Sequence, residues 1–187
     1  MSKYGIIILA AGGSSRLGKP KQLLLYQGKP LIQNIIDAAE AVPELYTVVV
    51  TGAVPIEVNV HSCYNEEWPS GIASTIRQGL SELLKLQPQA EACIITVCDQ
   101  PIITAEVLSS LIVRHEETGS GIAASGYAGT VGTPALFSSQ YFDELLQLRG
   151  DEGAKKVIKK YAHDVAILPF PGGETDIDTA EDYQRLT

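Results

Sequence analysis

The stretch IIILAAGGSSRLGKPKQLL, residues 6–24, determines how the rest of this sequence is interpreted. Its first part, residues 6–10, is an apolar run with the length and composition of a buried β-strand. Glycines and cations follow at once, at Gly12, Gly13, Arg16, Lys19 and Lys21. Glycine lacks the Cβ that keeps a ligand away from the backbone, so successive N–H groups can converge on an anion. The stretch therefore predicts a strand that leads into a polyphosphate-binding loop.

Two familiar phosphate-binding loops do not fit this stretch. Residues 13–19 match the beginning of a Walker A loop, but Pro20 stands where Ser or Thr must bind magnesium. The glycines also lack the spacing of the dinucleotide-binding fingerprint, and Pro20 disfavours an immediate helix. An ordinary glycine turn with solvated charges is the remaining alternative, and it leaves the clustering of the cations unexplained.

Residues 9–24, LAAGGSSRLGKPKQLL, resemble the signature loop of the MobA-like nucleotidyltransferases, and specifically that of the molybdenum cofactor cytidylyltransferases. The resemblance implies an α/β fold of the nucleotide-diphospho-sugar transferase type, with a Rossmann-like, mostly parallel sheet flanked by helices. It also implies that Arg16 and Lys21 hold the triphosphate of an incoming nucleotide. The other nucleotide-binding residues that it implies in this loop are Leu9, Ala10, Ala11, Gly12, Gly13 and Ser14.

Length and composition set the remaining bounds. A chain of 187 residues that is 45% hydrophobic predicts one domain, residues 1–187. The net charge of −8, with no basic run outside the first loop, argues against binding to nucleic acid or to an anionic membrane. No apolar segment reaches about 18 residues and no cleavable signal is recognisable, so we expect a cytoplasmic protein. The three cysteines form no C-x-x-C pair and are expected to be buried thiols.

The next elements follow a βαβ pattern with one irregularity. Helical spacing of apolar residues predicts a helix over residues 31–42, and β-branched residues predict a strand over residues 46–51. Alternation predicts a weaker third strand over residues 57–64. Only residues 52–56 remain to connect these strands, whereas a parallel pair needs a crossover of a dozen or more residues. The third strand is therefore irregular or antiparallel, or residues are missing.

A loop and a helix follow the third strand. Residues 72–86 carry apolar side chains at helical spacing, and Ser70 is a candidate cap. The preceding segment resembles the part of the family that contacts the nucleobase, which makes Gly71 and Ser74 candidates for base binding. The alternative is an ordinary capped helix start. Trp68 is expected to be a packing residue.

A second chemical motif follows the apolar strand over residues 92–97. Asp99 lies directly after this strand in the sequence Cys-Asp-Gln-Pro. Ligands of open α/β sheets bind outside the carboxyl ends of the strands, so Asp99 is expected near Gly12 and Arg16. A carboxylate there suits Mg²⁺, and the motif matches the metal-binding motif of the family. Capping of the helix predicted over residues 105–117 is the alternative role.

The last third of the chain carries weaker signals. Residues 121–127 and 132–137 predict a β-hairpin, and the resemblance makes Gly132 and Thr133 candidates for binding the acceptor. Residues 150–154, GDEGA, are a family motif as well as an ordinary helix start. By resemblance Asp178 is the second metal ligand, with Asp176 as a rival. Thr179 is a candidate cap for the last helix.

Together these motifs predict an enzyme. The resemblance implies Mg²⁺-dependent transfer of a nucleotidyl group from CTP to the phosphate of molybdenum-molybdopterin, with Arg16, Lys21 and Asp99 as catalytic residues. A molybdenum hydroxylase would be the recipient of the product. The alternatives are a GTP-using guanylyltransferase and a non-catalytic cofactor carrier. A nicotinamide-dependent reductase is disfavoured because the dinucleotide fingerprint fails.

Overall fold

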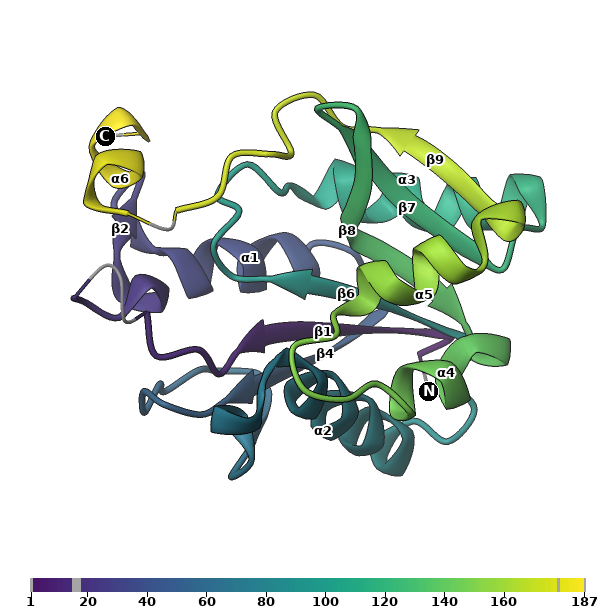
Figure 1. Ribbon diagram of the computed structural model, residues 1–187, viewed down its shortest axis with the longest axis horizontal. Coiled ribbons are helices and arrows are strands. Elements are labelled where there is room, and N and C mark those ends of the chain that lie inside the picture. Colours follow the sequence, from purple (N-terminus) through teal and green to yellow (C-terminus); the bar gives the residue numbers. More distant parts are fainter. Residues whose placement is uncertain (1, 15–17, 178, 187) are drawn as a thin grey trace.

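A twisted seven-stranded sheet forms the centre of the molecule in the computed structural model, which describes residues 2–14, 18–177 and 179–186 (Figure 1). The strand order is β5-β4-β1-β6-β8-β7-β9, and β8 is antiparallel to both of its neighbours. The strands are β1 (Tyr4–Ala10), β4 (Leu45–Thr51), β5 (His61–Tyr64), β6 (Ala92–Val97), β7 (Ile122–Tyr127), β8 (Thr130–Ser138) and β9 (Val165–Pro169).

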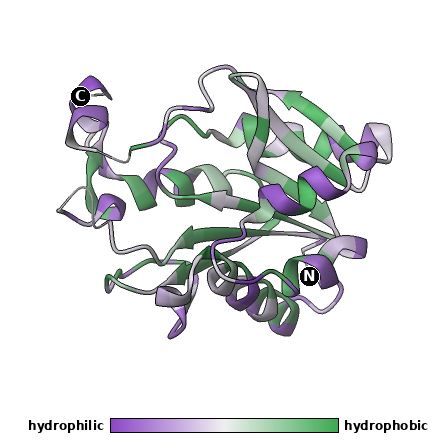
Figure 2. Cartoon of the chain, viewed as in Figure 1, coloured by the Kyte–Doolittle hydropathy of each residue, from purple (hydrophilic) through white to green (hydrophobic). Residues whose placement is uncertain are grey.

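Helices cover both faces of this sheet because its central strands are apolar on both sides. On one face lie α2 (Ile72–Leu86), α4 (Phe142–Leu146) and α5 (Ala154–Lys160), which pack against alternate residues such as Ile7 and Leu9. On the other face lie α1 (Leu31–Glu40) and α3 (Ala105–Thr118), which pack against Ile6 and Ile8. The continuous apolar colour of β1 in Figure 2 reflects this burial on both faces.

Smaller elements lie at the periphery. A two-stranded hairpin, β2 (Leu25–Tyr26) and β3 (Lys29–Pro30), lies beside the C-terminal helix α6 (Ala180–Leu186) in Figure 1. The Tyr183 hydroxyl donates a hydrogen bond to the Leu25 carbonyl at 2.8 Å, which links them. Single 3₁₀ turns occur at Lys21–Leu23, Trp68–Ser70, Ser139–Tyr141 and Ala162–Asp164. Within the described residues, no helix has the length and apolar character needed to cross a membrane.

The predicted fold class is confirmed, with a mostly parallel sheet between two helical layers. The hairpin predicted near Gly129 is confirmed as β7 and β8. Its two turn residues, Ala128 and Gly129, have φ of 46° and 72°, as in a type I′ turn. This turn brings the start of β8 back to the carboxyl edge of β6.

The third strand resolves the irregularity in the sequence. β5 begins only at His61 and pairs in parallel with β4, so the strand predicted over residues 57–60 is wrong and the antiparallel alternative is excluded. His61 pairs with Val48, so the overlap ends at Thr51 opposite Tyr64. The connection therefore returns by only a few residues, a distance that residues 52–60 can span without a helix at about 3.3 Å per residue. Its apolar residues Ile56, Val58 and Val60 pack against the α1 face.

Candidate active site

A cavity of about 220 Å³ opens at the carboxyl ends of β1 and β6. Its wall combines the end of β1, the loop that follows it, the start of α2 and the end of β6. The residues predicted as functional that line it are Leu9, Ala10, Ala11, Gly12, Lys21, Gly71 and Asp99. The cavity therefore gathers predicted site residues from three separate segments of the chain.

Lys21 and Asp99 form an ion pair across the cavity. The Lys21 Nζ donates to an Asp99 carboxylate oxygen, and the two side chains are only 19% and 15% exposed. The pair connects the loop after β1 with the loop after β6. It gives the cavity one ammonium and one carboxylate that are held close together and partly shielded from water.

The loop after β1 is fastened by a glutamine that the sequence analysis did not single out. The Gln22 side chain is 1% exposed, and its Nε2 donates to the carbonyls of Ala10 at 2.9 Å and Gly12 at 2.7 Å. Ser14 adds a second fastening, because its Oγ accepts a hydrogen bond from the Lys21 backbone N–H at 3.0 Å. Both contacts fold the loop so that Lys21 reaches the cavity.

The two glycines of the loop have different surroundings. A Cβ added to Gly12 would meet nothing within 4 Å, and Gly12 lines the cavity. A Cβ added to Gly13 would lie 3.4 Å from the Ala53 Cβ and 3.7 Å from the Trp68 ring. The absence of a side chain at Gly12 thus keeps this part of the cavity open, whereas Gly13 packs close to the Trp68 ring.

The start of α2 forms the opposite wall. Gly71 has φ of 109° and ψ of 171°, a conformation that is essentially restricted to glycine. It lines the cavity, but Ser74 does not. The Ser74 Oγ instead lies 2.8 Å from the Gly71 carbonyl and 2.9 Å from the Glu67 carbonyl, so it secures the loop from within. Its neighbour Thr75 lines the cavity in its place.

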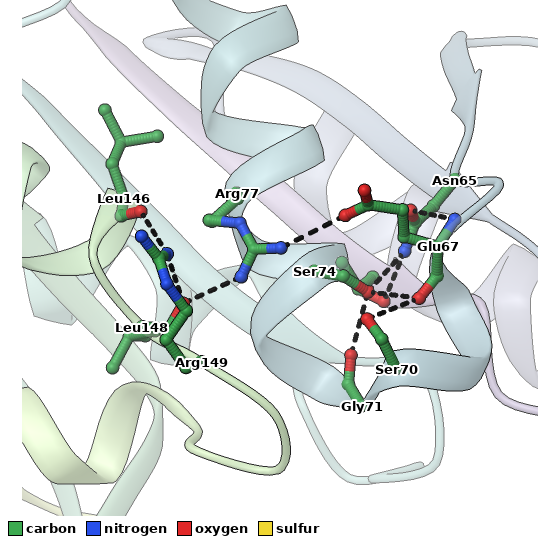
Figure 3. Close-up of polar contacts among 10 residues, drawn as sticks. Asn65, Glu67, Ser70, Gly71, Ser74, Arg77, Leu146, Leu148 and Arg149 are labelled. Atoms are coloured by element: carbon green, nitrogen blue, oxygen red, sulfur yellow. Dashed lines mark hydrogen bonds and ion pairs between the residues drawn. The ribbon is translucent and has the colours of Figure 1, made fainter.

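The loop at Gly71 is held by the GDEGA segment and by the residues just before it, which Arg77 contacts (Figure 3). The Gly150 carbonyl accepts a hydrogen bond from the Ala73 N–H at 3.0 Å. Arg77 joins the two loops, because it donates to the Leu148 carbonyl at 2.7 Å and to the Glu67 carboxylate at 3.2 Å. The helix α5 starts later, at Ala154, and Gly153 precedes it without a side-chain cap. In this structure the segment supports the cavity wall.

The predicted caps have mixed outcomes. The Ser70 hydroxyl donates to the Glu67 carbonyl at 2.8 Å, and α2 has no side-chain cap, so Ser70 does not cap it. Asp99 pairs with Lys21, and the residue that precedes α3 is Thr104. Thr179, a predicted cap of α6, accepts a hydrogen bond from the Asp182 N–H at 3.2 Å, which confirms that prediction.

Two predicted site residues, Arg16 and Asp178, lie outside the described residues. The chain next to Asp178 nevertheless contacts the cavity loop, because the Ile177 N–H donates to the Asp99 carbonyl at 3.2 Å. Gln100 adds a second link, from its Nε2 to the Gly173 carbonyl at 2.8 Å. Among the residues that the structure covers, no group of three or more His, Cys, Asp or Glu side chains is arranged to hold a metal ion.

The two candidates for acceptor binding lie at the same edge of the sheet but outside the cavity wall. β8 runs antiparallel to β6, and Ala135 pairs with Ile95, so Thr133 lies beyond the pairing toward the carboxyl edge. Its carbonyl accepts a hydrogen bond from the Tyr127 hydroxyl at 3.2 Å. A Cβ on Gly132 would lie 2.5 Å from that hydroxyl oxygen, so Gly132 makes room for Tyr127.

The cavity also contains a thiol, which the protein keeps protonated. Burial raises the pKa of Cys98 to about 12, with a further contribution from the Asp99 charge. Cys93 is also buried, and burial raises its pKa well above the usual range. Cys63 is half-buried rather than buried, so the expectation of three buried thiols holds for two of them.

Sequence reasoning missed Gln22 and Thr75 in the cavity wall. The helical spacing identified only apolar residues of α2, such as Ile72 and Ile76, so it did not single out Thr75. Gln22 gave no comparable signal, because a glutamine between a lysine and two leucines reads equally well as a surface residue. Trp68 lines the cavity as well.

Comparisons with known proteins agree with this geometry. The sequence model of the MobA-like NTP transferase domain matches residues 6–165. Purine catabolism protein PucB of Bacillus subtilis (strain 168) is 27% identical over 201 residues, covering 96% of this chain and 94% of PucB. The crystal structure of Rv0371c from Mycobacterium tuberculosis H37Rv is 30% identical, covers 99% of this chain and 97% of that one, and superposes with a TM-score of 0.81.

A second structure of Rv0371c bears on metal binding. It is a complex with manganese, with 27% identity, coverage of 99% of this chain and 98% of that one, and a TM-score of 0.79. A protein that shares this fold therefore binds a divalent metal. Because the matched region spans most of the sequence and includes the cavity residues of β1, α2 and β6, the chain belongs to the family of MobA-like NTP transferase domains and is a nucleotidyltransferase.

Proposed function

We propose that this protein transfers a cytidylyl group from CTP to the phosphate of molybdenum-molybdopterin, forming the cytosine dinucleotide cofactor and pyrophosphate. The observation that carries the proposal is the Lys21–Asp99 ion pair, which lies across a cavity whose floor Gly12 leaves open. The long match of residues 9–24 to the loop of the cytidylyltransferase branch favours this nucleotide and this acceptor.

The roles of the residues follow from their charges. The Lys21 ammonium and the Arg16 guanidinium would neutralise triphosphate oxygens, and the open space at Gly12 would let the phosphates approach the backbone N–H groups. An acceptor phosphate monoester is already largely anionic near neutral pH, so its attack on the α-phosphate needs little proton transfer. The main barrier is repulsion between two anions, which fixed cations lower by positioning and electrostatics.

The residues at this edge also fit a magnesium ion. Asp99 offers a partly exposed carboxylate, and its backbone carbonyl accepts a hydrogen bond from the N–H of Ile177, the residue before Asp178 in the sequence. Carboxylates are hard oxygen ligands of the kind that Mg²⁺ takes in nucleotide sites. Asp99 and Asp178 would hold the ion, which when bound would neutralise phosphate charge. Gly132 and Thr133, at the same edge, would face the acceptor.

Ligand-dependent thermal stability tests the nucleotide. A ligand at a hundred times its Kd adds about 2.7 kcal/mol, or about 5–10 °C in Tm for a chain of this size. We expect such a shift with CTP and magnesium, and none of that size with GTP, ATP, UTP or NADH. A shift with GTP alone would assign the guanylyl reaction, and no shift with any triphosphate would refute nucleotidyl transfer in favour of a cofactor carrier.

Turnover tests the residues. Pyrophosphate release from CTP with molybdenum-molybdopterin as acceptor is expected to fall about a hundred- to thousandfold or more in Asp99→Ala and in Arg16→Ala. Near-normal turnover of either variant at saturating magnesium would remove the role assigned to that residue. A molybdenum hydroxylase would take the product.

A further inference from the structure

We propose that Asn65 is a positioning residue for base selection, because it fixes the Thr75 hydroxyl as a hydrogen-bond donor toward the cavity. The inference rests on the proposed function, since it assigns how the nucleobase of the bound triphosphate is recognised. Asn65 lies between β5 and α2, is only 3% exposed and does not line the cavity itself. Its effect would pass through Thr75, which does.

The orientation of the Asn65 amide follows from its backbone partner (Figure 3). The Glu67 N–H lies 3.0 Å from the Asn65 Oδ1, and a backbone N–H can only donate. The oxygen must therefore face Glu67, and the Nδ2 must face the other side. There it lies 2.9 Å from the Ser74 Oγ and 3.1 Å from the Thr75 Oγ1. The two amide hydrogens are thus given to these two hydroxyl oxygens.

The two hydroxyls differ in whether their own hydrogen already has an acceptor in the protein. Ser74 has one hydrogen and two nearby carbonyls, those of Gly71 at 2.8 Å and Glu67 at 2.9 Å, so it is fully used inside the loop. The Thr75 oxygen accepts from Asn65, so its own hydrogen cannot return there. No acceptor for that hydrogen occurs within the part of the chain that the structure describes, and Thr75 is 5% exposed at the cavity wall.

The Thr75 hydroxyl would therefore present its proton to a ligand in the cavity, whose wall Thr75 helps to form. A buried donor favours a ligand that places an acceptor opposite it and rejects one that places a donor or an apolar group there, because the hydroxyl would otherwise stay unpaired. The matching chemistry is a carbonyl oxygen or an unprotonated ring nitrogen on a nucleobase edge. In cytosine these are O2 and N3. Asn65 selects this polarity without touching the base.

Asn65→Asp reverses the polarity at nearly constant volume. The carboxylate still accepts from the Glu67 N–H, but it cannot donate, so the Thr75 hydroxyl turns to it and leaves lone pairs facing the cavity. We expect CTP to bind about ten- to a hundredfold more weakly. Inorganic tripolyphosphate, which has no base, should bind as in the wild type, whereas an equal loss of both ligands would overturn the proposal. Ser70→Ala, which removes a hydroxyl bonded to the same loop at the Glu67 carbonyl, is the matched control and should change neither affinity.

A double-mutant cycle separates this role from a structural one. Thr75→Val removes the hydroxyl at similar size, and in that background Asn65→Asp should cost little further CTP affinity. The same loss in both backgrounds would mean that Asn65 acts through the loop as a whole and would overturn the proposal. Thr75→Ser, which keeps the hydroxyl, should retain the wild-type response to Asn65→Asp.

Asn65→Ala provides a second test of the proposal if the Asn65→Asp variant does not fold. Without any partner the Thr75 hydroxyl is no longer fixed as a donor, so CTP should bind less tightly than in the wild type but more tightly than in Asn65→Asp. If Asn65 only filled space, the smaller alanine would be the more harmful change. If wild-type protein binds tripolyphosphate and CTP equally well, no base is recognised and the inference fails. If it binds neither, the proposed function fails first.

Discussion

Substitution of Gly71 by alanine should destabilise this protein more than substitution of Gly150, whose backbone it faces, by alanine. An alanine at residue 71 would have to adopt φ of 109° and ψ of 171°, which costs about 1–3 kcal/mol for a residue with a side chain. Its Cβ would also lie 2.3 Å from the Gly150 carbonyl oxygen and 2.7 Å from the Asp151 Oδ1. Backbone cannot yield as a flexible side chain does, so the two segments must separate.

Separation also breaks the hydrogen bond between the Ala73 N–H and the Gly150 carbonyl, which contributes about 0.5–1.5 kcal/mol. The total destabilisation is therefore about 2–4 kcal/mol. For a chain of this length each kcal/mol lowers Tm by about 2–4 °C, so Tm should fall by about 5–15 °C. Gly71 lines the cavity, so nucleotide affinity should fall with it.

Gly150→Ala is the matched control for this prediction. Gly150 has φ of 56° and an added Cβ would meet nothing within 4 Å, so it carries the backbone strain without the collision. Its cost should be about 1 kcal/mol, or about 2–4 °C in Tm. Differential scanning calorimetry of both variants decides the matter. If Gly71→Ala melts at or above the temperature of Gly150→Ala, the packing argument for this corner is wrong.

Three further predictions concern other parts of the molecule. Gly12→Ala should keep the wild-type Tm within about 1–2 °C, because the added Cβ meets nothing within 4 Å. In calorimetric titration the same variant should bind triphosphate about tenfold or more weakly, and unchanged affinity would contradict a phosphate role for this loop. Burial disfavours the charged Asp164 carboxylate, but hydrogen bonds from the Tyr141 hydroxyl at 2.6 Å and the Gly121 N–H at 2.9 Å outweigh burial and lower its pKa. The stability that the Asp164 carboxylate provides is therefore present above about pH 4 and is lost as the pH falls through its folded pKa. Asp164→Asn should therefore lose less Tm than the wild type between pH 5 and 3, and parallel curves would show that another carboxylate is responsible. Burial raises the pKa of Cys63 to about 11 and that of Cys98 to about 12. A thiol reagent at pH 8 should therefore label the native protein slowly, and should label all three cysteines rapidly in denaturant. Fast labelling of one cysteine in the native protein would show that its thiol is accessible.

The sequence was informative where a residue's environment is local. The apolar runs of β1, β4 and β6 predicted buried strands because both faces of a central parallel strand must be apolar. The register of the sheet then placed the residues that follow β1 and β6 at one edge, so Gly12 and Asp99 met in one cavity as expected, and Lys21 joins them there. Strand periodicity and the topology of α/β sheets were sufficient for this part.

The rest depended on contacts between distant segments. Neither the Asn65 amide network nor the clamp of Arg77 on Leu148 leaves a trace in local periodicity, because each partner alone is an ordinary polar residue. The same limit explains Ser74 and Thr75, since adjacent helical residues point about 100° apart and the sequence alone does not fix which one faces a ligand. The strand expected at residues 57–60 failed because alternation describes a half-buried connection as well as a strand.

The contact between residues 71 and 150 also bears on the order in which the molecule is assembled. A chain emerging from the ribosome at about 5–20 residues per second exposes the Gly71 corner several seconds before the carbonyl that completes it. During that interval β1, β4 and β5 can already pair, while the first turn of α2 lacks the acceptor for its Ala73 N–H. The cavity wall formed by the start of α2 is therefore among the late parts of the molecule to form, and a nascent chain completes this cavity only after most of its sheet is in place.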